Sequence, residues 1–336
     1  MTREAGVDVG AYLAAYELPA SWRAVQEESG MNNTTRMIYA GDVRYVLRIY
    51  DNHQDSGIVE LEHHLLKELQ LAKLPFHVPQ PVFSREGKTI TVHQSGKLGA
   101  LYHYIEGERS SPDNDSHIEG LGWATGMLAH ALQRINVINK PLYEPYYEWE
   151  KTHFSVPNDR LRQLVNESEL LNYHLDELEQ LIGHRERLSE LRTHFMKLPH
   201  QWIHGDLVFS NCLAAGDRIV GILDFEFCTK DIRVMELAVV LAEFPHDDTD
   251  EAVRRIGLLC QGYGSAAQLT REELHHLPDL IKLRMMDVFL HFAGRYESNL
   301  DAAEVWDKQI VRTSFVCGWV DRNRERLMEL FLKFLL

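Results

Sequence analysis

Four polar residues in the second half of the chain have the types and the spacing that phosphoryl transfer needs. His204, Asp206 and Asn211 follow the pattern H-x-D-L-x-x-x-N, and Asp224 comes thirteen residues after Asn211, at the end of an apolar run. A carboxylate can accept the proton of an attacking hydroxyl, while amide and carboxylate oxygens are the hard ligands that hold Mg²⁺ on nucleotide phosphates. We therefore expect Asp206 to act as the base and Asn211 and Asp224 to bind the metal.

Each of these residues also has an ordinary structural explanation. His204, which we group with Asp206 as catalytic, is expected to hold the loop beside the base rather than to react. Asp206 could instead cap a turn, and Asn211 could be a turn residue. Asp224 would be costly to bury without a partner, so a nearby cation explains it better. The joint pattern favours chemistry for Asp206, Asn211 and Asp224.

The four residues lie in a β island within a mostly helical half of the chain. Residues 201–228 read QWIHGDLVFSNCLAAGDRIVGILDFEFC, in which residues 215–217 form a tight turn between two short apolar strands. Long segments on both sides carry apolar residues at helical spacing. We expect this hairpin to bring Asn211 and Asp224 together over one ion.

The N-terminal part of the chain has a different texture. Short β-rich runs lie at 36–40, 43–50, 88–94 and 100–107, and one helical segment lies at 57–72. That order predicts an α+β chain with two lobes. The first, residues 1–106, is a small antiparallel-sheet lobe with one main helix, and the second, residues 107–336, is larger and mostly helical.

Composition excludes several classes of function. The chain has 336 residues with 35 Lys and Arg against 50 Asp and Glu, a net charge of −15, which disfavours binding to nucleic acid. We expect a cytoplasmic protein without a signal peptide or membrane span, whose four dispersed cysteines stay reduced. Two histidine pairs, at 63–64 and 275–276, lack metal-ligand spacing and are expected on helix surfaces.

The sequences HGDLVFSN and GILDFEF resemble the catalytic and metal-binding motifs of the aminoglycoside phosphotransferase and type II homoserine kinase superfamily. The similarity extends in outline over residues 25–320. It implies the bilobal protein-kinase-like fold, with ATP and Mg²⁺ as cofactors and the hydroxyl of a small molecule as phosphate acceptor.

The same resemblance implies nucleotide-binding roles in the N-terminal lobe. The first hairpin would cover the phosphates with backbone and side-chain donors. These donors are Asn32, Asn33, Thr34 and Thr35. The stretch LYHYIEGE resembles the family's hinge, so the backbone around His103, Tyr104 and Ile105 would bind adenine.

Arg48 stands where the family often has a lysine that contacts the α- and β-phosphates. Arginine keeps the charge but is longer and has a planar donor fork, so the two residues are not interchangeable. Glu62 is the expected helix partner of Arg48, with Glu60 as second choice. An outward-facing arginine and a solvated glutamate are the structural alternatives.

Glu226 stands where protein kinases have the glycine of their DFG motif, and no A-P-E sequence follows. Both departures argue against a protein kinase. The resemblance further implies that Glu226, Asp231 and the helix around Trp123 and Met127 line the acceptor site, although Asp231 could simply be a helix N-cap.

Together these features predict an ATP-dependent kinase of a small metabolite that we expect to carry an amine. The acceptor would be like that of a homoserine kinase or of an aminoglycoside or choline kinase. The alternative is a nucleotide-binding but inactive family member with an interaction role, for which Arg48 in place of lysine is the main support. A homodimer is left open.

Overall fold

The chain divides into two compact units. The computed structural model describes residues 8–26, 33–51, 56–137 and 141–336. The first unit comprises residues 1–107, 135–140 and 220–226, and the second comprises residues 108–134, 141–219 and 227–336. Asp224 and Glu226 therefore fold with the N-terminal residues, whereas Asp206 and Asn211 belong to the second unit.

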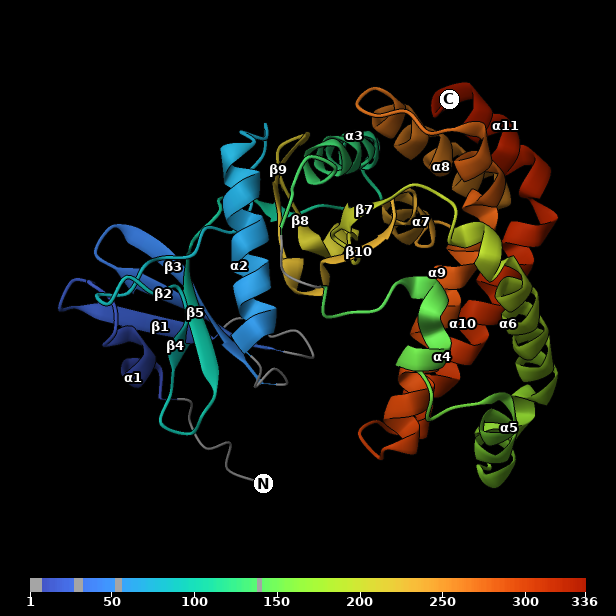
Figure 1. Cartoon of the computed structure of the whole chain (residues 1–336), viewed down its shortest axis with the longest axis horizontal. Coiled ribbons are helices and arrows are strands. Elements are labelled where there is room, and N and C mark those ends of the chain that lie inside the picture. The colour runs from blue at the N-terminus through green and yellow to red at the C-terminus, as the bar shows by residue number, and fades with distance from the viewer. Residues whose placement is uncertain (1–7, 27–32, 52–55, 138–140) are drawn as a thin grey trace. The chain divides into compact units, whose positions relative to one another are not determined.

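The first unit is built on a five-stranded antiparallel sheet with the order β1-β2-β3-β5-β4 (Figure 1). Its elements are α1 (Val9–Leu13), β1 (Trp22–Gln26), β2 (Asn33–Ala40), β3 (Val43–Tyr50), α2 (Ser56–Leu71), β4 (Thr91–Val92) and β5 (Leu98–His103). The strands and the helix expected from the sequence are present. Strand β1 and helix α1 were not expected, because β1 is mostly exposed and therefore lacks apolar alternation.

The core of the first unit forms where apolar side chains of three strands meet the N-terminal segment. Ile38 of β2, Leu47 of β3 and Leu101 of β5 pack with Tyr12 of α1 and with Tyr16, which follows it. Side chains on a strand alternate between its two faces, so the residues beside Leu47 are free to point elsewhere. This alternation is what allows β3 to place Arg48 outside the core.

The second unit is mostly helical, as its sequence predicts. Its helices are α3 (Asp115–Leu132), α4 (Trp149–Thr152), α5 (Asn158–Glu167), α6 (Leu175–Phe195), α7 (Met235–Leu241), α8 (Thr249–Gly264), α9 (Arg271–Glu297), α10 (Ala303–Arg322) and α11 (Arg324–Phe334), with 3₁₀ turns η1 (Tyr146–Glu148), η2 (Leu171–His174) and η3 (Phe209–Asn211). A further 3₁₀ turn, η4 (Phe225–Phe227), spans the boundary with the first unit. Helix α9 begins with a capping box between Thr270 and Glu273 and continues through Pro278.

Short strands interrupt these helices at the predicted β island. Strand β7 (His200–Ile203) pairs antiparallel with β10 (Thr229–Ile232), and β6 (Glu108–Arg109), β8 (Cys212–Ala215) and β9 (Arg218–Ile222) form a three-stranded sheet. The β8–β9 hairpin confirms the predicted turn at 215–217, where Gly216 has a φ of +56°. The loop between β7 and β8 carries the H-x-D-L-x-x-x-N pattern.

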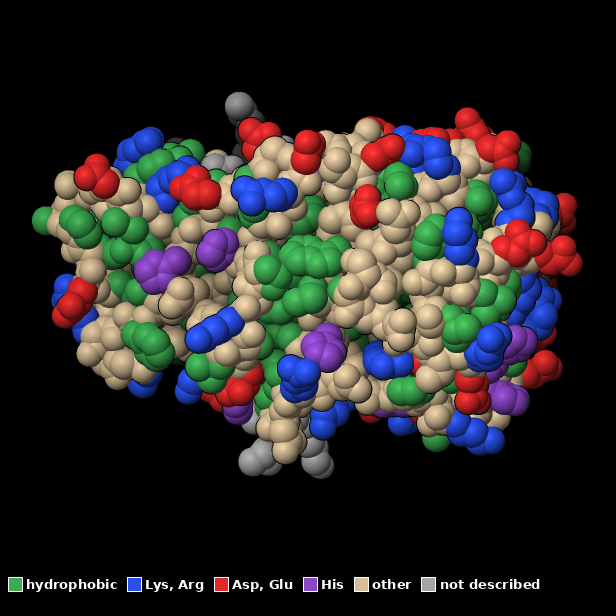
Figure 2. All heavy atoms as spheres, turned by 90° about the horizontal axis from the view of Figure 1, so that it is seen from above, with side chains coloured by type: hydrophobic (Ala, Val, Ile, Leu, Met, Phe, Trp, Pro, Cys, Tyr) green, Lys and Arg blue, Asp and Glu red, His purple; other side chains and the backbone are tan. Residues whose placement is uncertain are grey.

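Figure 2 shows acidic and basic side chains interspersed over the face that it presents. Arg254 pairs with Asp115 and Glu251, and Arg162 pairs with Glu179, so many charges of the second unit are matched locally. In the described part of the chain, none of the helices combines the length and the apolar character needed to cross a membrane. The four cysteines are buried and form no disulfide.

Helices α3 and α8 approach so closely that their backbones are almost in contact. A Cβ atom on Gly262 would collide with the backbone oxygen of Glu119, and a Cβ on Gly122 would collide with that of Leu259. Glycine is therefore required at these two positions by lack of space, since both lie within helices where glycine is otherwise unfavourable.

We expect Gly262→Ala to lower the free energy of unfolding by about 1–3 kcal/mol, the usual cost of overpacking. Chemical denaturation with a fluorescence readout measures this change. Gly257→Ala is the matched control on the same helix, because its new Cβ would meet only Leu330, at 3.6 Å. That control should be neutral or stabilising by about 0.5–1 kcal/mol. Equal effects of the two substitutions would contradict the close approach of α3 and α8.

Candidate active site

The loop between β7 and β8 is fixed by a buried glutamate on α7. Glu236 is fully buried, and its carboxylate accepts the backbone N–H of His204 at 2.6 Å and that of Gly205 at 3.4 Å. His204 is also fully buried, and its Nδ1 accepts the backbone N–H of Asp206 at 3.2 Å. These contacts give His204 the structural role expected from the sequence, because its ring holds the backbone of the residue that carries the carboxylate.

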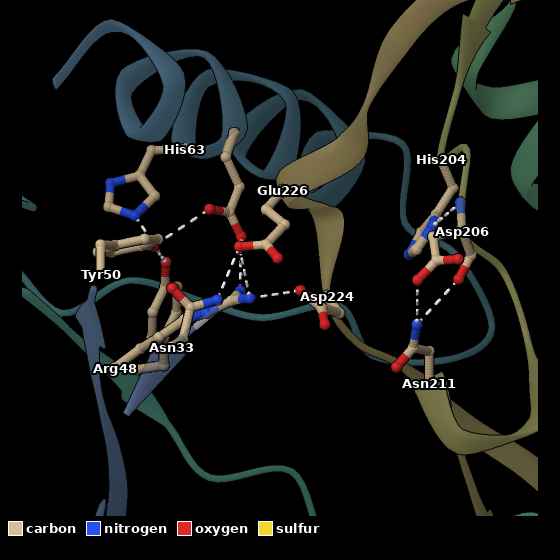
Figure 3. Close-up of polar contacts among 11 residues, drawn as sticks. Asn33, Arg48, Tyr50, His63, His204, Asp206, Asn211, Asp224 and Glu226 are labelled. Atoms are coloured by element: carbon tan, nitrogen blue, oxygen red, sulfur yellow. Dashed lines mark hydrogen bonds and ion pairs between the residues drawn. The ribbon is translucent and has the colours of Figure 1, made fainter. Parts of the chain in front are cut away.

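Asp206 and Asn211 lie side by side in this loop. The Asn211 side-chain amide donates to the Asp206 backbone oxygen at 2.8 Å and to Asp206 Oδ2 at 3.3 Å (Figure 3). The structure thus brings together two of the residues that the sequence pattern singled out. Because the amide nitrogen is committed to Asp206, the Asn211 oxygen points away from it.

A segment before α4 is attached to the same loop. Tyr146 donates from its hydroxyl to the Gly205 backbone oxygen, and its backbone N–H donates to Asp231 Oδ2 at 2.6 Å. Asp231 is fully buried in β10 and also accepts the backbone N–H of Ile232 at 2.6 Å. Burial raises the pKa of Asp231 to about 7, although these two N–H groups oppose the shift.

An arginine from α9 reaches the predicted base. Arg284 Nη2 lies 2.5 Å from Asp206 Oδ1, and Arg284 Nη1 donates to the Tyr146 hydroxyl at 2.8 Å. Burial lowers the pKa of Arg284, but Tyr146 and Asp206 outweigh this effect and raise it above its usual value. The guanidinium group therefore stays charged beside the carboxylate.

In the first unit, Arg48 is surrounded by three carboxylates. It contacts Glu62 Oε1 at 3.4 Å, Glu226 Oε2 at 3.0 Å and, more closely, Asp224 Oδ1, as Figure 3 shows for Asp224. Glu62 is thus the helix partner of Arg48, as predicted, while Glu60 is exposed. Arg48, the predicted phosphate-binding residue, and Asp224, the predicted metal ligand of this unit, are therefore in direct contact.

The charges of this cluster depend on one another. Burial lowers the pKa of Arg48, yet the carboxylates of Asp224 and Glu62 raise it well above its usual value. Burial raises the pKa of Glu62 to about 7 against the opposing effect of Arg48. Three acids around one cation leave the cluster with excess negative charge when all are ionised, which favours an additional cation nearby.

Asn211, in the second unit, and Asp224, in the first, each have an oxygen of the kind that binds magnesium. Asn211 Oδ1 and Asp224 Oδ2 accept no hydrogen bond from any residue that the structure describes, and both are hard oxygen ligands. Asp224 has a φ of +68°, a conformation that is uncommon outside glycine and that concentrates at functional sites. Taken singly, each of the two residues has the donor chemistry of the metal ligand that the sequence predicts.

The other expected nucleotide-binding residues lie at the ends of strands in the first unit. Asn33 is buried and donates to Glu226 Oε2 at 2.7 Å, while Thr34 donates to Asp51 Oδ2 at 2.6 Å. Tyr104 and Ile105 follow β5 and are half-buried. Asn32 lies outside the described residues. The nucleotide-binding roles of these residues stay predictions.

Two expectations are wrong. His63 and His276 were expected on helix surfaces, but both are buried, whereas their neighbours His64 and His275 are exposed. His63 bonds the Tyr102 hydroxyl at 2.8 Å, and burial lowers its pKa to about 4. The pair pattern failed because adjacent helix positions point about 100° apart, so one of two neighbours can face the core.

Asp231 is also not a helix N-cap. Helix α7 begins at Met235 with Val234 before it, and Asp231 is part of β10, where it holds Tyr146. The N-cap interpretation failed because the residues after Asp231 continue the strand pairing to His200 before the helix begins.

Comparison with known proteins decides the family. A model described as "Phosphotransferase enzyme family" matches residues 23–274, about three quarters of the chain. The chain belongs to this family. Membership confirms the predictions, made from HGDLVFSN and GILDFEF, of an enzyme of this kind and of a small-molecule kinase.

Curated relatives and solved structures agree with this assignment. The chain is 26% identical over 292 residues to homoserine kinase of Sinorhizobium medicae (83% of this chain, 81% of the relative). It is 27% identical over 285 residues to homoserine kinase of Brucella canis (82% and 80%). The fold is similar to that of an amicoumacin kinase solved with AMP-PNP and Ca²⁺ (TM-score 0.68, 18% identity, 92% of this chain and 91% of that one). It is also similar to a microcompartment-associated aminopropanol kinase (TM-score 0.66, 18% identity, 95% and 97%), and the predicted kinase-like α+β fold is confirmed.

Three residues that contact the loop between β7 and β8 were missed by the sequence analysis. Glu236 interrupts the apolar run VMELAVVL, and Arg284 lies in IKLRMMDVFL, where Lys282 and Asp287 also interrupt the apolar residues. A charged residue inside such a run is costly to bury without a partner, so the anomaly itself was a usable signal. Tyr146 carries no such signal, because its position beside Gly205 depends only on the course of the chain before α4.

The raised pKa of Asp231 predicts a pH-dependent contribution to stability. The folded state binds this proton more tightly than the unfolded state, in which the pKa is 3.8. The contribution is therefore full at low pH and is lost as the pH rises to about 7. We expect the melting temperature of the wild type, measured relative to Asp231→Asn, to fall over this range and to level off above it.

Differential scanning fluorimetry across the pH range measures this difference. Asp217→Asn, at an exposed turn, is the control and should differ from the wild type by a constant amount. A constant difference for Asp231→Asn as well would show that the Asp231 carboxylate does not titrate in this window.

Proposed function

We propose that this chain transfers the γ-phosphoryl group of ATP, as its magnesium complex, to a hydroxyl of a small metabolite. The carrying observation is the fixed loop in which Asp206 is held by Asn211 and by the backbone contacts of His204. Phosphoryl transfer needs little covalent chemistry from the protein, so placing one carboxylate correctly is a large part of what the enzyme must do.

Asp206 accepts the proton of the acceptor hydroxyl as that oxygen attacks the γ-phosphorus. The bond from the γ-phosphorus to the bridging oxygen breaks, and ADP leaves with the electron pair. Glu236 and His204 act as positioning residues, because they fix the loop backbone and are themselves fully buried. The acceptor leaves as its phosphate ester.

Residues of the first unit bind the nucleotide. Arg48 contacts its phosphates while Glu62 orients the guanidinium group, and the segment at Asn33 and Thr34 lies over the phosphates. The backbone at Tyr104 and Ile105 binds adenine. Asn211 and Asp224 would hold Mg²⁺, which neutralises charge on the phosphate oxygens when it is bound.

The acceptor class follows from the relatives. Homoserine kinases and an aminopropanol kinase are named for small amine-bearing alcohols, so we propose an acceptor of this size and type. The alternative of an inactive nucleotide-binding member was based on Arg48 in place of the usual lysine, and the family match and the kinase relatives argue against it. The ion pair between Arg48 and Glu62 favours an active site over an inactive one. We place its action in the cytoplasm, where ATP is available and cysteines that form no disulfide stay reduced.

Replacement of the base provides the first test. We expect Asp206→Asn to lower kcat by roughly 10²–10⁴-fold, the usual range for a general base, while the dissociation constant for Mg·ATP stays within a few-fold of wild type. A coupled ADP-release assay with homoserine, choline, ethanolamine and aminoglycosides measures turnover. Asp176→Asn, at an exposed position on α6, is the control. Wild-type turnover by Asp206→Asn would remove this residue from the mechanism.

Replacement of the metal ligand in the first unit provides the second test. We expect Asp224→Ala to weaken Mg·ATP binding roughly tenfold or more, as loss of a metal-site group commonly does. Isothermal titration calorimetry with and without Mg²⁺ measures this affinity. Asp42→Ala removes an exposed acid from a turn of the same unit and should leave binding unchanged. Unchanged Mg·ATP affinity in Asp224→Ala would contradict the metal role.

A further inference from the structure

Both oxygens of the proposed base are already engaged. Asp206 Oδ1 lies 2.5 Å from Arg284 Nη2, and Asp206 Oδ2 accepts from the Asn211 amide at 3.3 Å. The Arg284 contact is the shorter one and joins opposite charges, so it is the stronger of the two. An acceptor hydroxyl must therefore compete with Arg284 for Oδ1 before Asp206 can take its proton.

Arg284 is not needed to hold the loop. The backbone of this loop is already fixed by the Glu236 carboxylate, by the His204 ring and by the Asn211 amide. The Tyr146 hydroxyl fixes the other terminal nitrogen of Arg284 at 2.8 Å, so the guanidinium group would keep its place if Asp206 were drawn away. Arg284 can therefore bind a ligand without loss of the loop structure.

Small molecules can reach this pair. The side chains of Arg284 and Asp206 are 18% and 25% exposed, so neither is sealed inside the protein. Other acids near Arg284 have donors of their own. Asp287 lies 2.8 Å from His153 Nε2, and Glu243 accepts the backbone N–H of Phe209 at 3.1 Å. Asp206 is thus the carboxylate to which Arg284 is bonded directly.

We propose that the acceptor is a hydroxy acid whose carboxylate binds Arg284 and thereby releases Asp206 for the hydroxyl. This inference rests on the proposed function and narrows its acceptor class. A guanidinium group has a planar donor fork that matches a carboxylate. The carboxylate of the acceptor gives Arg284 an alternative anionic partner, so Asp206 Oδ1 becomes available at the moment when the hydroxyl arrives.

An amino alcohol without a carboxylate cannot release Asp206 from Arg284 in this way. Its hydroxyl is neutral and cannot replace Asp206 as a partner of the arginine. Its ammonium group would be repelled by Arg284 if it lay close to the hydroxyl. An amine on a hydroxy acid must then lie on the side of the molecule away from Arg284.

The test compares matched acceptors that differ only in the carboxylate. L-Homoserine and 3-amino-1-propanol form one such pair, and L-threonine and 1-amino-2-propanol form another. We expect the wild type to have the higher kcat/KM for at least one hydroxy acid over its matched amino alcohol. Arg284→Gln should reduce that ratio by roughly 10–100-fold, the range expected for one lost hydrogen bond to a charged group.

Two variants control for structure. Arg284→Lys keeps the charge without the fork and should recover part of the preference. Arg295→Gln removes a paired arginine on the same helix, where Arg295 contacts Asp301, and should leave the ratio unchanged. Circular dichroism and Mg·ATP affinity verify that each variant is folded.

Three outcomes overturn the inference. The first is a wild type that prefers each amino alcohol to its hydroxy acid. The second is an equal fall in kcat/KM for the hydroxy acid and for its matched amino alcohol in Arg284→Gln, since Arg284 would then act on the base or on the phosphoryl group. The third is measured by titration calorimetry of the acceptors in the presence of AMP-PNP, which prevents transfer. Equal affinity of wild type and Arg284→Gln for the hydroxy acids would contradict binding of their carboxylate by Arg284. Because calorimetry needs no turnover, it decides this inference even if the proposed function fails.

Discussion

The buried carboxylate of Glu236 accepts two backbone N–H groups, and the loop between β7 and β8 depends on this contact. Residues 204–211 have little regular structure, and a loop of this kind can place a side chain only if its backbone is fixed from outside. Glu236 supplies that support from α7, with His204 and Gly205 as its donors. A carboxylate is costly to bury without partners, and these two donors offset part of the cost of burying Glu236 completely.

In both units, an arginine forms ion pairs with carboxylates to which we assign a role in the reaction. In the first, Arg48 is the cation for Glu62, Glu226 and Asp224, and in the second, Arg284 is the cation for Asp206. Arg48 faces three carboxylates, whereas Arg284 forms an ion pair with one. Arg48 has more acids than it can neutralise, which suits a site for a divalent cation. Arg284 binds Asp206 Oδ1, the oxygen that we propose takes the proton of the acceptor hydroxyl. This arrangement suits a site in which a bound substrate replaces Asp206 as the partner of Arg284.

The polar network behind Arg48 extends deeper into the first unit. The Tyr50 hydroxyl lies 3.1 Å from Glu62 Oε2 and 2.7 Å from the Tyr102 hydroxyl, which in turn contacts His63 (Figure 3 shows Tyr50 and His63). The polar side chains of this network each have a hydrogen-bond partner within it or beside it, so the network holds Glu62 in one orientation. The position of Arg48 is thus set by β3 and α2 together.

The sequence by itself determined the class of fold and the family, and it singled out the residues to which we assign chemistry. Strand and helix periods come from local chain geometry, and the H-x-D-L-x-x-x-N pattern with Asp224 is carried by one continuous segment, so both can be read along the chain. Tertiary structure alone decided that Glu236 and Arg284 converge on the loop of Asp206 and that His63 is buried. Such contacts join residues far apart in the chain, such as Asp206 and Arg284, and depend on how helices pack, which no local pattern specifies.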